Sequence, residues 1–176
     1  MTLFGWIAAL TAATSYAGFA ATDLILPAVG RVDGAAGSHF YTTVWVTNPS
    51  NATVSFEMTF LASLPASAAK PPVYRATLGP DATIVYENVA ETLFGVKGVV
   101  GTARIVSSGE LLASSRIYNL AEGSSSASSS GQFFAAVPAE FGAARGEEAV
   151  LQGVRADDDF RYTFLLAETL GKPTRA

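Results

Sequence analysis

Few side chains in this sequence could carry out catalysis. The chain contains one histidine, His39, and no cysteine, which excludes thiolate nucleophiles, disulfide bonds and zinc sites with sulfur ligands. A serine nucleophile would need His39 as its base, together with a carboxylate that orients the imidazole. Ser38 is adjacent in the chain, but local spacing places no Asp or Glu beside His39. We therefore interpret His39 as a solvated turn residue.

Carboxylates could bind a cation or cleave a glycosidic bond. The three aspartates at residues 157–159 supply the oxygen ligands that Ca²⁺ prefers, but they lack the alternating spacing and the distal Glu of a calcium loop. Two acid pairs, Glu87 with Glu91 and Glu147 with Glu148, could act in glycoside hydrolysis. No pattern places either pair in a cleft, so we expect solvent exposure. The sequence predicts no catalytic residue, no metal site and no cofactor.

Aromatic side chains offer a different chemistry, which is stacking on sugar rings. Tyr41, Trp45 and Tyr74 are predicted to lie on strands, and together they could form a platform for a carbohydrate. Aromatic residues on strands more often pack in the core or across strands. A sugar platform is therefore the alternative interpretation of these three residues.

Length and charge limit the classes of partner. The 176 residues suit one domain of ordinary size, which can bury a core without help from metals or disulfides. The formal net charge is -4, and only 15% of the residues are charged. Because no basic field is present, we expect no nucleic-acid partner.

The N-terminal residues predict where the protein is located. Residues 3–21 are almost all apolar or small, and no charge precedes Asp23. An apolar stretch followed by small residues, here Ser15 and Ala17 or Gly18 and Ala20, is typical of an export signal and its cleavage site. The expected Lys or Arg near the start is absent, so a retained membrane anchor is the alternative. We predict an export signal over residues 1–20 and a secreted or cell-surface location.

Short apolar or alternating runs separated by turn residues follow this segment. Residues 40–47 and 53–61 show the two-residue period of strands, and the second run places four side chains on one face, namely Val54, Phe56, Met58 and Phe60. We predict three hairpins: residues 40–47 with 53–61, residues 73–78 with 82–86, and residues 99–106 with 111–118. Asn88 is predicted to cap a helical turn that Gly95 ends. This pattern favours an all-β, antiparallel β-sandwich of about nine strands with one or two short helical turns.

Three segments follow the predicted signal. We expect a β-sandwich domain over residues 21–122, a Ser- and Gly-rich loop or linker over residues 123–131, and C-terminal strands over residues 132–176 that complete the sandwich or a partner's sheet.

A partial internal sequence repeat involves the last predicted strand. Residues 160–167 resemble residues 40–47, although only two of the eight positions are identical and chance is an alternative. If these residues are a true repeat, the chain stops after the opening strands of a second unit, and the last predicted strand needs a partner sheet. Its candidate assembly residues are Phe160, Tyr162, Phe164 and Leu166.

Several structural motifs carry a resemblance to a known family. They are Gly-Pro-Asp-Ala-Thr-Ile-Val-Tyr-Glu-Asn-Val from residue 79, Leu-Phe-Gly-Val-Lys-Gly-Val-Val-Gly-Thr-Ala-Arg-Ile from residue 93, Ser-Arg-Ile-Tyr-Asn from residue 115, and Gly-Gln at residue 131. With the Asn-Pro turn that ends residues 44–49, these motifs resemble repeat modules of secreted, largely uncharacterised bacterial proteins with immunoglobulin-like sandwiches. The resemblance spans residues 24–168. It implies an immunoglobulin-like sandwich and supplies no catalytic residues.

Three functions follow as expectations. The first is a non-catalytic structural or adhesive protein of the cell surface or exterior, which self-assembles by strand exchange into a homo-oligomer or binds another extracellular protein. The second is a carbohydrate-binding accessory module, and the third is a secreted hydrolase built around His39. We expect membrane contact only through an uncleaved N-terminal segment.

Overall fold

The computed structural model describes residues 18–34, 37–63, 70–120, 128–153 and 164–169. Its strands are β1 (Ala21–Asp33), β2 (His39–Thr47), β3 (Val54–Ala62), β4 (Val73–Leu78), β5 (Thr83–Tyr86), β6 (Val99–Asn119), β7 (Ser130–Ala135) and β8 (Val137–Pro138). One short helix, α1 (Val89–Thr92), and one 3₁₀ turn, η3 (Ala139–Phe141), complete the described elements.

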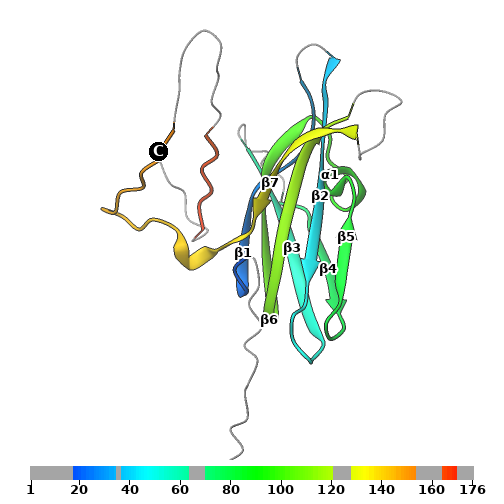
Figure 1. The fold of residues 1–176 in the computed structure, drawn as a ribbon, viewed down its shortest axis with the longest axis vertical. Helices are drawn as coiled ribbons and strands as arrows, with labels where there is room; N and C mark the ends of the chain where they lie inside the picture. The colour runs from blue at the N-terminus through cyan, green and yellow to red at the C-terminus, as the bar shows by residue number, and fades with distance from the viewer. Residues whose placement is uncertain (1–17, 35–36, 64–69, 121–127, 154–163, 170–176) are drawn as a thin grey trace, which may run out of the picture.

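All eight strands belong to one antiparallel sheet that curls into a half-barrel (Figure 1). The strand order is β4-β3-β6-β1-β2-β5, and β7 and β8 pair with β6 and β1, respectively. The prediction of an all-β antiparallel fold is confirmed. The prediction of a two-sheet, immunoglobulin-like sandwich is wrong, because the two halves share strands and form a single sheet.

The shared strand β6 explains this correction. It runs for 21 residues, pairing first with β1 and β3 and then with β2 and β7. The predicted hairpin turn at residues 107–110 is wrong, because the backbone stays extended there and Gly109 is not among the residues with positive φ. The same chain therefore serves both halves of the sheet.

The other two predicted hairpins are also wrong. The turns at residues 48–51 and 79–82 are present, but β2 pairs with β5 and β6, while β3 pairs with β4 and β6. At each turn the chain crosses from one half of the half-barrel to the other. A turn sequence predicts where the chain reverses direction. The curl of the sheet determines which strand each strand pairs with after the turn.

The predicted helical turn is present as α1. Its C-terminal end is confirmed at Gly95, which has φ of 66° and donates its N–H to the carbonyl of Glu91 at 3.1 Å. Asn88 stands at the N-cap position, but its side chain makes no capping bond to a helix N–H. Instead Asn88 Nδ2 donates to Glu91 Oε2 at 3.0 Å, so side-chain capping by Asn88 is not observed.

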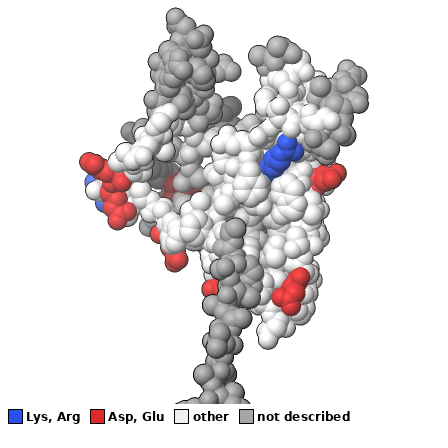
Figure 2. Space-filling model, in the orientation of Figure 1, with Lys and Arg blue, Asp and Glu red and all other residues white. Residues whose placement is uncertain are grey.

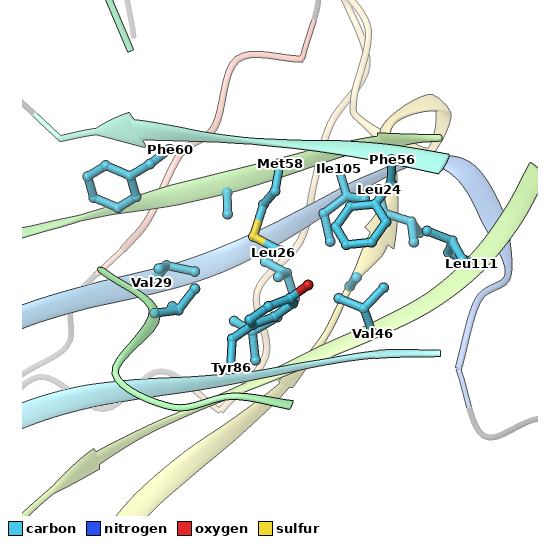
Figure 3. Close-up of a cluster of buried hydrophobic side chains, with 14 of the residues drawn as sticks. Leu24, Leu26, Val29, Val46, Phe56, Met58, Phe60, Tyr86, Ile105 and Leu111 are labelled. Atoms are coloured by element: carbon cyan, nitrogen blue, oxygen red, sulfur yellow. The ribbon is translucent and has the colours of Figure 1, made fainter. Parts of the chain in front are cut away.

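The core lies on the inner face of the half-barrel (Figure 3). The predicted face of β3 is confirmed, since Val54, Phe56, Met58 and Phe60 are all buried. They meet side chains from the other strands, including Leu24, Leu26, Val46, Ile105 and Leu111. Each such buried side chain contributes about 1.5–3 kcal/mol to folding. Beyond α1, Phe94 stacks on Phe60 with ring centroids 5.6 Å apart.

The two ends of the strand path, β4 and β5, are not paired with each other. On the inner side the rings of Tyr74 and Tyr86 meet across this gap edge to face, with centroids 5.4 Å apart. Tyr86 is only 8% exposed, and its hydroxyl has no hydrogen-bond partner among the described residues. Burial raises the pKa of the Tyr86 hydroxyl, and the neighbouring Tyr74 adds to this shift.

Replacing Tyr86 with phenylalanine is expected to stabilise the protein by about 1 kcal/mol, because the change removes a buried hydroxyl without a partner and keeps the ring. Stability should also fall less steeply above pH ~10, since unfolded tyrosine ionises there and the buried hydroxyl does not. Urea unfolding at pH 7 and pH 10.5 measures both effects. Tyr118→Phe is the matched control, because the Tyr118 hydroxyl is buried but lies 3.5 Å from the Thr43 hydroxyl. A loss of stability in Tyr86→Phe would contradict the prediction.

Candidate binding surfaces

Aromatic side chains collect on the outer face of β2, β6 and β7. Because side chains alternate along a strand, Tyr41 and Trp45 of β2 both point outward, opposite the buried Val44 and Val46. The β2–β6 register places Tyr118 beside Tyr41. The β6–β7 register extends the same face to Phe133, which is 62% exposed.

Arginine side chains hold this aromatic pair in place. The rings of Tyr41 and Tyr118 stack with centroids 6.1 Å apart and planes inclined by 26°. The guanidinium of Arg31 lies 4.4 Å from the Tyr41 centroid, and that of Arg116 lies 5.0 Å from the Tyr118 centroid. Arg116 is itself anchored, since its Nη2 donates to the carbonyl of Ser129 at 2.7 Å. The four side chains therefore form a row in the order Arg31, Tyr41, Tyr118 and Arg116, which we call the arginine ladder.

The structure separates the three predicted platform residues. Tyr41 and Trp45 share the outer face, four residues and thus about 13 Å apart along β2. Tyr74 lies opposite the buried Met58 on the inner face and packs on Tyr86. The face of the molecule seen in Figure 2 carries few charged side chains. The aromatic patch on the outer face consists of Tyr41, Trp45 and Phe133 around the buried Tyr118.

Sequence reasoning missed Tyr118 and Phe133, which lie more than 70 residues beyond Tyr41 in the chain. Only the strand register brings them to the same face. Their outward positions on β6 and β7 follow the alternation of those strands, but a two-residue period alone does not say which strands are neighbours.

His39 has a carboxylate partner that local spacing did not reveal. The β1–β2 register pairs Asp33 with His39, and Asp33 Oδ1 lies 2.6 Å from His39 Nδ1. Arg31 Nη1 donates to the same oxygen at 2.7 Å. These hydrogen bonds, chiefly the one from Arg31, lower the pKa of Asp33. The expectation that no acid accompanies His39 is therefore wrong.

This cluster is nevertheless a surface ion-pair group. The side chains of Asp33 and His39 are 68% and 38% exposed, at the end of a two-stranded ribbon. The backbone N–H of His39 donates to Asn119 Oδ1 at 2.8 Å, which ties the ribbon to β6. The arrangement provides a base and an orienting acid, but it is far more exposed than a site that must exclude water.

Glu91 and Glu147, one acid from each predicted pair, each contact another group of the protein. Glu91 binds Lys97 at 2.5 Å, and this bond, with a smaller contribution from Asn88, lowers the pKa of Glu91. Glu87 is exposed, and Glu147 Oε2 accepts the backbone N–H of Ala144 at 2.7 Å. Residues 157–159 lie outside the described part of the chain. Within the described ranges, no three His, Asp or Glu side chains gather closely enough to hold a metal ion.

The described C-terminal candidates lie outside the sheet. Phe160 and Tyr162 fall outside the described residues, whereas Phe164 and Leu166 belong to an irregular segment and are 57% and 82% exposed. Residues 164–168 stand beside the outer face of β3 and β6, and a groove of about 830 Å³ lies between them. In Figure 1 this segment, at the red end of the colour scale, lies apart from the strands.

Comparison with known proteins identifies the fold. The structure is similar to that of the Thermotoga maritima protein 1070, with a TM-score of 0.53. The two sequences are 14% identical, and the match covers 70% of this chain and 97% of that chain. No protein-family model matches this chain, and no curated protein sequence matches it. The likeness therefore shows an all-β antiparallel half-barrel and nothing about activity.

A search for membrane-spanning helices gave none: within the described residues, no helix has the length and apolar character needed to cross a bilayer.

Proposed function

We propose that this chain is a non-catalytic, exported structural or adhesive module that associates with further copies of itself through its C-terminal residues. One observation carries the proposal, which is the distribution of exposed apolar side chains. Of the eleven large hydrophobic residues that are exposed in the described chain, six follow residue 140. They are Phe141, Val150, Leu151, Phe164, Leu165 and Leu166.

Where such exposed apolar side chains lie together, they form the kind of surface that proteins use for interaction. The eight strands of the half-barrel all end by Pro138, and the described residues from 142 to 153 and from 164 to 169 form no strand. The described C-terminal residues therefore add apolar surface without contributing a strand to their own sheet. A second copy that covers this surface gains hydrophobic burial in proportion to the area removed from water.

Export is supported by the N-terminal sequence. The predicted signal, residues 1–20, ends immediately before the first described strand, since β1 begins at Ala21. Removal of such a segment would leave the half-barrel strands intact.

Deletion of residues 154–176 is expected to convert a self-associated protein into a monomer, because it removes three of the six exposed apolar side chains and leaves all eight described strands in place. Light scattering at several protein concentrations measures the mass, and circular dichroism checks that the sheet is retained. Val85→Ser is a matched control, since it removes an exposed apolar side chain from β5 instead. An unchanged oligomeric mass after the deletion, or a monomeric full-length protein, would refute the proposal.

A second candidate function, carbohydrate binding, is favoured by the aromatic patch on the outer face. Tyr41 and Trp45 point the same way from one strand, and the arginine ladder fixes Tyr41. Rings held in advance lose little conformational freedom when they bind a ligand. Because Arg31 and Tyr118 lie over the Tyr41 ring, the Trp45 ring is the one that we propose to stack on the apolar face of a sugar.

If this second function holds, Trp45→Ala should weaken binding to the recognised glycan at least about tenfold, which corresponds to a loss of ~1.4 kcal/mol. Glycan-array screening followed by calorimetry with the best ligand provides the measurement. Val85→Ala serves as the control, because Val85 pairs with Trp45 across β2 and β5 and is exposed but not aromatic. Array signals at background level for the wild-type protein would dismiss carbohydrate binding.

A further inference from the structure

We infer that the groove on the outer face of β3 and β6 is the acceptor site for self-association, and that its occupant is the segment 164–168 of a second copy of this chain. This inference rests on the proposed function and adds to it the place at which the two copies meet.

The floor of the groove is formed by two adjacent rows of outward-facing side chains. The β3–β6 register pairs Glu57 with Val106, Thr59 with Arg104 and Leu61 with Thr102. All six of these residues line the groove. The floor therefore presents Val106 and Leu61 at two diagonally opposite corners and Glu57 and Thr102 at the other two, with Thr59 and Arg104 in the middle row.

Arg104 gives the floor a fixed cation. Its Nε and Nη2 donate to the two carboxylate oxygens of Asp23 at 2.9 and 2.6 Å, a bidentate pair that locks the guanidinium. The pKa of Arg104 is raised, mainly by this hydrogen bond to Asp23 and to a smaller extent by the negative charge of Glu168. The segment 164–168 thus carries apolar side chains for the floor and a carboxylate for its cation.

Within its own copy, the segment leaves its apolar side chains largely exposed. Residues 164–168 line the groove from one side, yet Phe164 remains 57% exposed and Leu166 remains 82% exposed. The groove between the segment and the strands has room, about 830 Å³, for further chain. A second copy that places the same residues in this space buries the side chains that the first copy leaves in water.

Because the two chains are identical, the exchange can be reciprocal; insertion in one direction only would give a ring or a filament instead. When the segment of each copy enters the groove of the other, the same contacts are made in both directions, which gives a closed two-fold dimer. Exchange of an identical element is a low-cost route to a dimer, because each groove receives the same sequence that already stands beside it.

Disulfide trapping between two single-cysteine variants tests the inference, since the natural chain has no cysteine to interfere. A size-tagged Thr59→Cys variant is mixed with an untagged Leu166→Cys variant and oxidised mildly. A disulfide requires Cα atoms within about 7 Å, so a tagged heterodimer should form in high yield. The control, Ser55→Cys, faces outward from the same strand about 13 Å away and should give at least tenfold less heterodimer.

The possible results separate this inference from the proposed function. Heterodimer from Thr59→Cys but not from Ser55→Cys supports the inference. Absence of that heterodimer from a protein that is oligomeric by light scattering overturns the acceptor site and leaves self-association standing. A double variant, Thr59→Cys with Leu166→Cys, that gives only an intramolecular disulfide in a monomer overturns the inference together with the proposed function.

Discussion

Replacing Gly101 with valine is expected to destabilise the protein by more than about 3 kcal/mol, or to prevent folding. A Cβ atom at Gly101 would lie 2.1 Å from the carbonyl oxygen of Leu61 and 2.9 Å from the Cα of Ala62. Both contacts are with backbone of the neighbouring strand β3, so no side-chain rotation relieves them. Gly101 also pairs with Val29 of β1, which confines the strand on its other edge. Urea unfolding followed by circular dichroism measures the loss.

The control for this prediction is Gly79→Ala. A Cβ at Gly79 meets nothing within 4 Å, and the residue is not among those with positive φ. This substitution should therefore leave stability unchanged or raise it by up to about 1 kcal/mol, by restricting the unfolded chain. Equal stability of Gly101→Val and the natural protein would show that β3 and β6 do not approach as closely as the structure places them.

The identity of the elements could be predicted from the sequence, because it depends on local chemistry. The alternation in β3 placed Phe56 and Phe60 on the core side, and Gly95 ended the helical turn through its positive φ. These features are determined by residues a few positions apart. The same reasoning placed the turns at residues 48–51 and 79–82.

The pairing of the elements could not be predicted, because it depends on contacts between distant residues. Ser107 and Gly109 are residue types that favour turns, yet β6 continues through them, because it pairs with β1 and β3 up to residue 107 and with β1 and β2 from residue 111. A continuous β6 turns two expected sheets into one curled sheet. The aromatic patch depends on the same long-range register, since Tyr118 reaches Tyr41 only through the β2–β6 pairing.

The contact between His39 and Asp33 could not be predicted either, although the two residues are close in the sequence. Asp33 is six residues away, and no sequence motif links it to the histidine. The ribbon of β1 and β2 brings Asp33 and His39 directly opposite each other. Alternation predicts which face a side chain takes, whereas the register decides which side chain it meets.

Asn48 is the clearest case of a residue whose position could be predicted and whose role could not. The sequence placed it in a turn, and in the structure it is fully buried. Its Nδ2 donates to the carbonyls of Ala52, Leu78 and Gly79 at 2.7, 3.3 and 2.8 Å. Its Oδ1 accepts from the backbone N–H and the hydroxyl of Ser50 at 3.0 and 2.8 Å. One side chain therefore ties the turn after β2 to the turn between β4 and β5.

Asn48→Asp is expected to cost about 3–5 kcal/mol at pH 7, because a buried carboxylate replaces a donor that three carbonyl oxygens require. Burial beside carbonyl oxygens would raise the pKa of the new carboxyl above its unfolded value of ~3.9. Stability is then lost as pH rises above the unfolded pKa, so the deficit should shrink as pH falls from 7 toward 4. Urea unfolding across this range measures it.

The exposed Asn51 lies in the same turn, so Asn51→Asp introduces the same charge without burying it. That control should change stability by less than about 0.5 kcal/mol at either pH. A deficit in Asn48→Asp that does not depend on pH would mean that the lost donor, and not the buried charge, accounts for the effect. A deficit no larger than that of Asn51→Asp would mean that the two turns do not depend on Asn48. The half-barrel would then be held at this end by strand pairing and core packing alone.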